Sequence, residues 1–107
     1  MGARVHFITG TDTGAGKTLF TALLLAHLRA NGHRALAVKP VCTGPRDDVR
    51  LLQSLQPGEL TDAEMNPFHF RKPAAPVVAG QGRGVSPAKV ARSVSNIKRK
   101  CDILLVE

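Results

Sequence analysis

The chain has 107 residues, enough for one domain at most and too few for a catalytic domain joined to a separate substrate domain. Hydrophobic residues make up 43% and charged residues 21%, a globular composition that excludes disordered and fibrous proteins. The formal net charge is +7, but basic residues are spread over both halves of the chain, and it has no Tyr or Trp to stack on bases. We therefore expect no nucleic-acid partner and interpret the basic cluster at 98–100 as a solvated helix end.

The cysteines and apolar segments exclude further classes. Cys42 and Cys101 are far apart and lack the spacing of a disulfide framework or a zinc site. The longest apolar stretch, over 19–28, is interrupted by Thr21 and His27 and is shorter than the roughly 18–20 residues that a bilayer requires. The first residues have the pattern of a strand rather than of a signal peptide. These features predict a cytoplasmic protein without membrane contact.

The hydrophobic pattern predicts three strands, over 5–9, 35–39 and 103–106. The last is a continuous apolar run, which is typical of a strand covered on both faces. A further segment, 65–70, is expected to be extended but irregular because it contains Pro67. Any core must be built mainly from aliphatic side chains, because only 4% of the residues are aromatic.

Helices are predicted between these strands. The first is expected from about 17 to 31, with Gly32 as a left-handed C-cap. A short helix is expected from 47, where acidic residues favour its N-terminus, and is ended by Pro57-Gly58. One or two turns are expected over 74–80, and a final helix is expected from Pro87 to about 99, with Ser86 as its N-cap. Alternating strands and helices predict an α/β fold with a parallel, doubly wound sheet.

The last predicted strand is followed directly by Glu107, where the sequence stops. In open α/β sheets, ligand-binding groups lie at the carboxyl ends of the strands. We therefore expect residues 1–107 to be the N-terminal part of a single domain that is truncated here.

The strongest motif lies between the first strand and the first helix, where residues 10–18 read GTDTGAGKT. Backbone N–H groups of such a turn, with a helix N-terminus behind them, form an anion site for phosphates. Lys17 would reach the β- and γ-phosphates, and the Thr18 hydroxyl would bind Mg²⁺. The spacing is that of a variant Walker A, since the standard motif would have glycine at Thr11. The motif predicts a P-loop NTPase.

This loop and four later segments, in order, resemble dethiobiotin synthetase, the ATP-dependent enzyme of biotin synthesis. The later segments are Val38-Lys39-Pro40-Val41, Asp48 ahead of 49–52, Asn66-Pro67-Phe68-His69-Phe70 with Pro73 and Ala75-Pro76 after it, and Leu104-Leu105-Val106-Glu107. The resemblance covers essentially the whole chain but only about the first half of a family domain. The ordered set is far more specific than the loop alone, which a wider group of NTPases shares.

The resemblance implies roles for individual residues. Those that would bind ATP are Gly14, Ala15, Gly16, Lys17, Thr18, Leu19 and Asp48. The Mg²⁺ ligands would be Thr18, Asp48 and Glu107, three hard oxygen donors. Lys39 matches the catalytic lysine and would act together with Lys17, and Thr13 and Thr43 match positions near the substrate.

The resemblance also implies a reaction. The substrates would be 7,8-diaminononanoate, CO₂ or bicarbonate, and ATP, with Mg²⁺ as the cofactor. One amine would become a carbamate, ATP would phosphorylate it to a carbamic-phosphoric anhydride, and the second amine would close the cyclic urea. A homodimer is implied as well.

Several alternatives remain open on the sequence. Asp47 competes with Asp48 for the metal role. Each of them could instead serve only to stabilise the N-terminus of the helix. Lys39 and Glu107 could be polar residues at strand ends. Two positions depart from the family: Gly14 stands where many relatives carry a larger, often acidic residue, and Val77 stands where the family commonly has His.

Other protein classes also fit parts of the pattern. A switch ATPase of the partitioning or division-site type would carry an additional lysine early in the loop, where this chain has 11–13 without one. A cobyrinate-type amidoligase would share the loop and would need a glutamine amidotransferase domain downstream. A chain that binds phosphate without catalysis is the last alternative.

Overall fold

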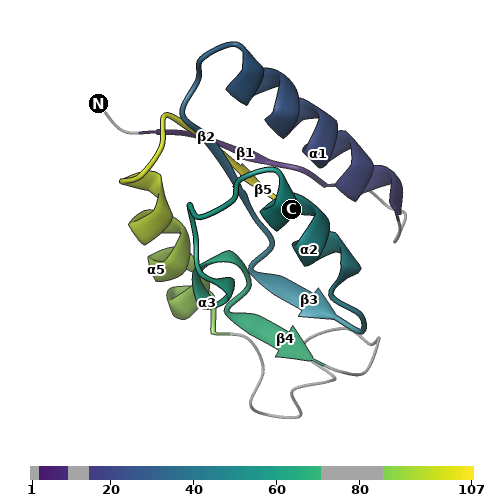
Figure 1. Ribbon diagram of the computed structural model, residues 1–107. Helices are drawn as coiled ribbons and strands as arrows, with labels where there is room; N and C mark the ends of the chain where they lie inside the picture. Colours follow the sequence, from purple (N-terminus) through teal and green to yellow (C-terminus); the bar gives the residue numbers. More distant parts are fainter. Residues whose placement is uncertain (1–2, 10–14, 71–85) are drawn as a thin grey trace.

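The computed structural model describes residues 3–9, 15–70 and 86–107 (Figure 1). Its main sheet has three parallel strands in the order β1-β5-β2. These strands are β1 (Arg4–Phe7), β2 (Ala35–Val38) and β5 (Ile103–Val106). Phe7 and Val38 both lie level with Val106, so the three strands end together at one edge of the sheet. The predicted parallel sheet is confirmed.

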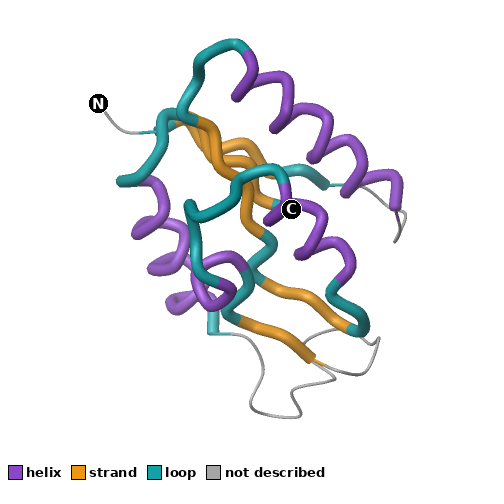
Figure 2. The backbone as a smooth tube through the Cα atoms, viewed as in Figure 1, coloured by secondary structure: helices purple, strands orange, loops and turns teal. Residues whose placement is uncertain are grey.

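Helices cover both faces of this sheet, as the tube drawing shows (Figure 2). Helix α1 (Ala15–Ala30) packs on β2 and on α2 (Asp47–Ser54), whereas α5 (Pro87–Lys98) packs against β5. The short helix α3 (Asp62–Met65) also lies against β2. Helices on both faces of a parallel sheet make the fold α/β and doubly wound, as predicted.

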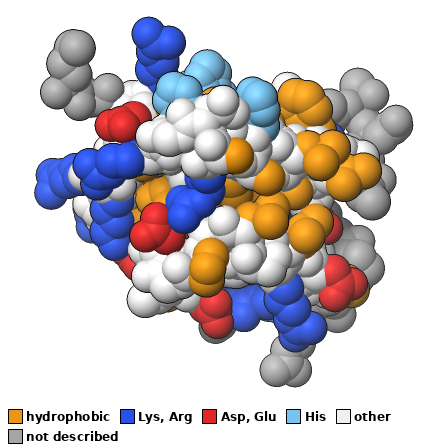
Figure 3. Space-filling view, turned by 45° about the horizontal axis from the view of Figure 1, so that its top comes forward, with side chains coloured by type: hydrophobic (Ala, Val, Ile, Leu, Met, Phe, Trp, Pro, Cys, Tyr) orange, Lys and Arg blue, Asp and Glu red, His pale blue; other side chains and the backbone are white. Residues whose placement is uncertain are grey.

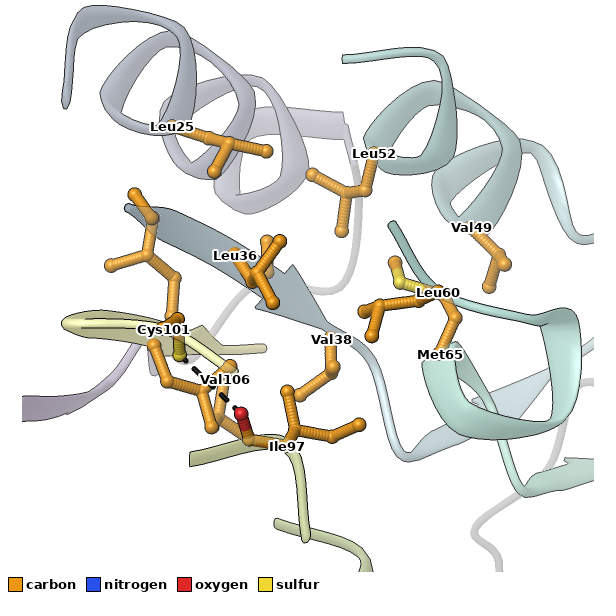
Figure 4. Close-up of a cluster of buried hydrophobic side chains, with 14 of the residues drawn as sticks. Leu25, Leu36, Val38, Val49, Leu52, Leu60, Met65, Ile97, Cys101 and Val106 are labelled. Atoms are coloured by element: carbon orange, nitrogen blue, oxygen red, sulfur yellow. Dashed lines mark hydrogen bonds between the residues drawn. The ribbon is translucent and has the colours of Figure 1, made fainter. Parts of the chain in front are cut away.

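The core fills the space between the helices and the main sheet (Figure 4). Its fully buried large side chains are aliphatic or Met: Leu25, Leu52, Met65, Ile97, Leu104, Leu105 and Val38. Each contributes about 1.5–3 kcal/mol by leaving water. No phenylalanine is among the buried core residues that the described part of the chain provides, which confirms the expected aliphatic core.

The structure contains two further strands, and only one of them, β4 (Phe68–Phe70), lies in a segment that was predicted to be extended. β3 (Val41–Thr43) and β4 form a separate two-stranded parallel sheet in which Cys42 lies opposite His69. Strand β3 was not predicted, because three residues are too few to show an alternating pattern. The extended segment predicted over 65–70 was partly wrong, since Met65 ends helix α3 and only 68–70 is a strand.

Helix α3 has a signal in the sequence that the prediction overlooked. Thr61 and Glu64 form a capping box, in which the Thr61 side chain accepts from the Glu64 N–H and the Glu64 carboxylate accepts from the Thr61 N–H. The pattern of Thr followed three residues later by Glu marks a helix N-terminus. No helix was predicted over 62–65, although this pattern is present in the sequence.

Other predicted boundaries shift slightly. Strand β1 ends at Phe7 rather than at 9, although the Ile8 N–H still donates to the Val106 carbonyl at 2.7 Å. Helix α1 begins two residues earlier than predicted, β2 ends at Val38 rather than at 39, and α2 ends at Ser54, before Pro57. The helical turns predicted over 74–80 lie outside the described residues.

Two predicted caps are confirmed. Gly32 has a φ of 83° just after α1, and the Ser86 hydroxyl accepts from the Lys89 N–H at the start of α5. The left-handed φ explains why glycine follows α1, because other residues are strained there.

One buried side chain, Gln56, satisfies the outward-facing backbone groups at Ala37, on the outer edge of β2. Its amide accepts from the Ala37 N–H at 2.9 Å and donates to the Ala37 carbonyl at 2.7 Å. The same two groups would otherwise need a neighbouring strand or water. Gln56 is fully buried and therefore acts as a substitute for one residue of a fourth strand.

The opposite edge, at β1, is apolar and open. Phe7 is 66% exposed, and an apolar cleft of about 610 Å³ runs between β1 and α5, lined by Val5, Phe7, Val90 and Val94 among others. Leu19, Phe20 and Leu23 on α1 are exposed too, and hydrophobic side chains gather on the right of the face in Figure 3. None of the helices in the described segments has both the length and the apolar character needed to cross a membrane.

Candidate functional site

Four of the predicted residues meet at the carboxyl ends of the main strands. Thr18 lies in the first turn of α1, Lys39 follows β2, Asp48 lies in the first turn of α2, and Glu107 follows β5. The Glu107 N–H donates to the Val38 carbonyl at 3.0 Å, which sets Glu107 beside the end of β2. The strand-end rule of α/β sheets predicts this convergence.

Glu107 is the centre of the cluster. The Thr18 hydroxyl donates to its Oε1 at 2.5 Å, and Lys39 Nζ lies 3.4 Å from the same oxygen. The Glu107 side chain is only 3% exposed. Its second oxygen, Oε2, is buried and has no hydrogen-bond partner among the described residues. A buried carboxylate oxygen without a donor is costly unless a ligand or cation completes it.

Lys39 joins Glu107 to Asp48. Its Nζ also lies 3.2 Å from Asp48 Oδ2, so one ammonium faces two carboxylates. Burial alone would lower the pKa of Lys39, but the charges of Glu107 and Asp48 outweigh it and raise the pKa above its ordinary value. Lys39 therefore carries a fixed positive charge at neutral pH.

The cluster distinguishes the two acidic residues that open α2. Asp48 faces Lys39 and is partly buried, whereas Asp47 is exposed. Both carboxylates lie in the first turn of α2, close to its unpaired N–H groups, and the N-cap residue Arg46 makes no side-chain cap there.

A cysteine on β3 lies close to the cluster. Burial raises the pKa of the Cys42 thiol, although the positive charge of Lys39 acts in the opposite direction, and the thiol stays protonated.

The remaining predicted site residues are not part of this four-residue cluster. Gly16 and Lys17 lie in the first turn of α1, which Ala15 opens, and Leu19 begins the next turn. Lys17 is half-buried, and its carbonyl accepts from the Thr21 hydroxyl at 2.9 Å. In the part of the chain that the structure describes, Thr43 makes none of the hydrogen bonds that connect the four clustered residues. Thr13 and Gly14 lie outside that part.

The donor set fits a magnesium ion bound together with phosphate. It offers two carboxylates and one hydroxyl, all oxygen, and one of the carboxylate oxygens is without a partner. Across the described residues, no three His, Cys, Asp or Glu side chains gather as a complete metal cage. Mg²⁺ suits such an incomplete set because it keeps water ligands and binds through substrate phosphates.

Asn66 lies next to the cluster, although the sequence predicted no role for it there. It is buried beside the end of β2, where its amide donates to the Lys39 carbonyl at 2.9 Å. The motif that Asn66 forms with Pro67 indicates no contact with Lys39. An amide before a proline, close in the chain to a short helix, signals backbone capping only in general terms.

Comparison with known proteins places the chain in a family. A model described as an AAA domain matches residues 4–107. The chain belongs to this AAA-domain family. It is 34% identical to the ATP-dependent dethiobiotin synthetase BioD of Xanthomonas euvesicatoria over 111 residues, which cover 94% of this chain and 50% of that protein.

Two further relatives carry the same name. The BioD of Bacillus subtilis is 34% identical over 97% of this chain and 48% of its own length. The BioD of Akkermansia muciniphila is 42% identical over 73% of this chain and 37% of its own length. These relatives confirm the resemblance that the ordered motifs predicted. The chain spans about half the length of the curated relatives that it matches.

Proposed function

We propose that the protein carrying this chain is an ATP-dependent dethiobiotin synthetase. The observation that supports it best is the contact of Lys39 with both Asp48 and Glu107, with Thr18 on the same Glu107 oxygen. This cluster joins the first turn of the helix after the phosphate loop to the two strand ends whose motifs resemble the family. The printed names of the relatives support the same activity.

The proposed substrates are ATP, 7,8-diaminononanoate and CO₂ or bicarbonate. One amine adds to CO₂ and loses a proton to give a carbamate. A carbamate oxygen then attacks the γ-phosphorus of ATP, and ADP leaves. The second amine attacks the carbonyl carbon of this mixed anhydride and loses a proton, phosphate leaves with its electron pair, and the cyclic urea closes.

The residues of this chain divide the work. The N–H groups at the start of α1, with Gly14, Ala15, Gly16 and Leu19 around them, would hold the phosphates. Lys17 and Lys39 would stabilise the negative charge that builds on the transferring phosphoryl group and on the carbamate. These are fixed charges in a partly dry site, where they act more strongly than in water.

The proposed metal ligands are Thr18, Asp48 and Glu107. When bound, Mg²⁺ would screen the charge of the phosphate oxygens. Thr13 and Thr43 are proposed to contact the diamine side of the site, and the resemblance also supports a homodimer. Residues 1–107 would be the N-terminal part of a P-loop domain in this proposal.

ADP release by the intact protein tests the proposal. The diamine and bicarbonate are supplied separately and together, with Lys39→Ala as the comparison. We expect ADP only when both substrates are present and little ADP from the variant. ADP formed equally well without the diamine would favour a switch ATPase instead, and ADP formation that requires glutamine would favour an amidoligase.

A further inference from the structure

Asn66 is almost fully buried at the junction of α3 and β4. Its Nδ2 donates to three backbone carbonyls, those of Lys39 at 2.9 Å, Phe68 at 3.1 Å and Pro40 at 3.3 Å. An amide nitrogen has two hydrogens, so at least one of them is shared between acceptors. Such a buried, fully used donor fixes the relative positions of the carbonyls that it contacts.

The same segment also holds the other polar backbone group of Lys39. The Lys39 N–H donates to the Met65 carbonyl at 3.0 Å, while the Lys39 carbonyl accepts from Asn66. Strand β2 ends at Val38, so Lys39 lies just beyond the last residue that the sheet holds in place. Residues 65 and 66 therefore bind the backbone of Lys39, which the sheet no longer holds.

We propose that Asn66 is a positioning residue for Lys39, holding its backbone so that the ammonium reaches Asp48 and Glu107 together. The inference rests on the proposed function for its catalytic consequence only. Lysine is long and has four rotatable side-chain bonds, so the place of its ammonium depends on a fixed Cα. A shift of about 1 Å in a positioned group can cost about 10²-fold in rate.

The chain offers a matched control in Gln56. It is also a buried amide, and it also bonds to the β2 backbone, but at Ala37 rather than at Lys39. Asn66→Asp and Gln56→Glu make the same change, amide to carboxylate, at the two places. Asn66→Ala and Gln56→Ala remove the same hydrogen bonds without adding a charge near Lys39, so this pair is used for the chemical-modification readout. Circular dichroism of all four selects the variants that are folded.

The first readout does not depend on the reaction. Lys39 and the exposed Lys89 are acetylated in the same sample by a trace of acetic anhydride, and mass spectrometry gives the ratio of their rates. We expect Asn66→Ala to raise the relative rate at Lys39 by about tenfold, the factor that corresponds to losing a hydrogen bond to a charged group. Gln56→Ala should change it by less than about twofold.

The second readout is ADP formation by the intact protein. The Asn66 variants should lower kcat by about 10- to 100-fold and leave the KM for ATP nearly unchanged, because Lys39 is positioned for the transition state. Unchanged acetylation of Lys39 in folded Asn66→Ala, or an equal change in Gln56→Ala, would overturn the inference. If the unmodified protein forms no diamine-dependent ADP, the proposed function fails, and the acetylation result still decides the role of Asn66.

Discussion

The two ends of the main sheet carry ion pairs of very different kinds. At the carboxyl ends, Lys39 is 18% exposed and lies against Glu107, which is 3% exposed. At the amino ends, Arg29 pairs with Glu59 at 3.1 Å and Lys100 pairs with Glu64, and all four side chains are roughly a third to a half exposed. The chemistry of the groups is the same, but their access to water is not.

At the amino ends, arginine side chains also donate hydrogen bonds to backbone carbonyls. Arg29 donates to the Ala35 carbonyl and Arg34 to the Lys100 carbonyl, around a polar cleft of about 380 Å³. Lysine and arginine side chains gather toward the left of the face in Figure 3, where this end of the molecule lies. Exposed pairs of this kind contribute little to stability. At the carboxyl end, Glu107 Oε2 is buried and without a partner in the described residues, as expected of a site built to receive a ligand.

Among the changes that test this difference between the two ends, replacing Lys39 with Met should have the largest effect. Methionine keeps much of the length and apolar volume of the side chain but removes the charge that faces Asp48 and Glu107. ADP formation should fall by about 10²- to 10³-fold, the usual cost of removing one fixed donor to a developing anion. Lys100→Met is the control at the other end and should leave the rate unchanged within about twofold. A loss of less than about fivefold in Lys39→Met would contradict a catalytic role for this charge.

A double-mutant cycle at the carboxyl end should show the next largest effect. The variants Lys39→Met, Glu107→Gln and the double variant are compared by urea unfolding. We expect a coupling free energy of about 1.5–3 kcal/mol, because the contact is charged on both sides and mostly shielded from water. A coupling under about 0.5 kcal/mol would show that this pair behaves like a surface pair.

The sequence was sufficient to predict much of this end of the sheet. Thr18 and Glu107 follow from a loop motif and from a polar residue after an apolar strand, and parallel strands bring such ends together. The family resemblance selected Asp48, but the residue pattern alone does not separate it from Asp47, because both lie in the first turn of α2 and the packing of that helix decides which one faces Lys39.

Other features could not be predicted, for physical reasons. Gln56 and Asn66 act through side-chain amides on backbone groups far away in the chain, and no local pattern reports such contacts. Strand β3 exists because β4 pairs with it, not because its three residues favour a strand. Helix α3, in contrast, was marked by Thr61 and Glu64 and could have been found.

The pH dependence of stability should separate the two ends. The raised pKa of Lys39 means that its stabilising contribution is complete below its ordinary value of 10.5 and is lost as pH rises through the raised value. The pKa of Glu64 is lowered, chiefly by the hydrogen bond from Lys100, so its contribution is present above its ordinary value of 4.5 and is lost as pH falls through the lowered value. Urea midpoints across pH should show a weaker alkaline loss in Lys39→Met and a weaker acid loss in Glu64→Gln. Identical profiles in all three proteins would contradict both assignments.

The smallest expected effect is a second cycle, at the amino end, with Lys100→Met and Glu64→Gln. Glutamine can still accept from the Thr61 N–H, so the capping box is kept and the cycle isolates the ion pair. Because Lys100 is 46% exposed and Glu64 31%, we expect a coupling of about 0.2–1 kcal/mol. In 1 M salt, where the Debye length is about 3 Å, this coupling should shrink toward zero, while that of Lys39 with Glu107 should largely persist. Equal couplings at the two ends, with equal salt dependence, would mean that burial does not distinguish them and that Lys39 has no special electrostatic environment.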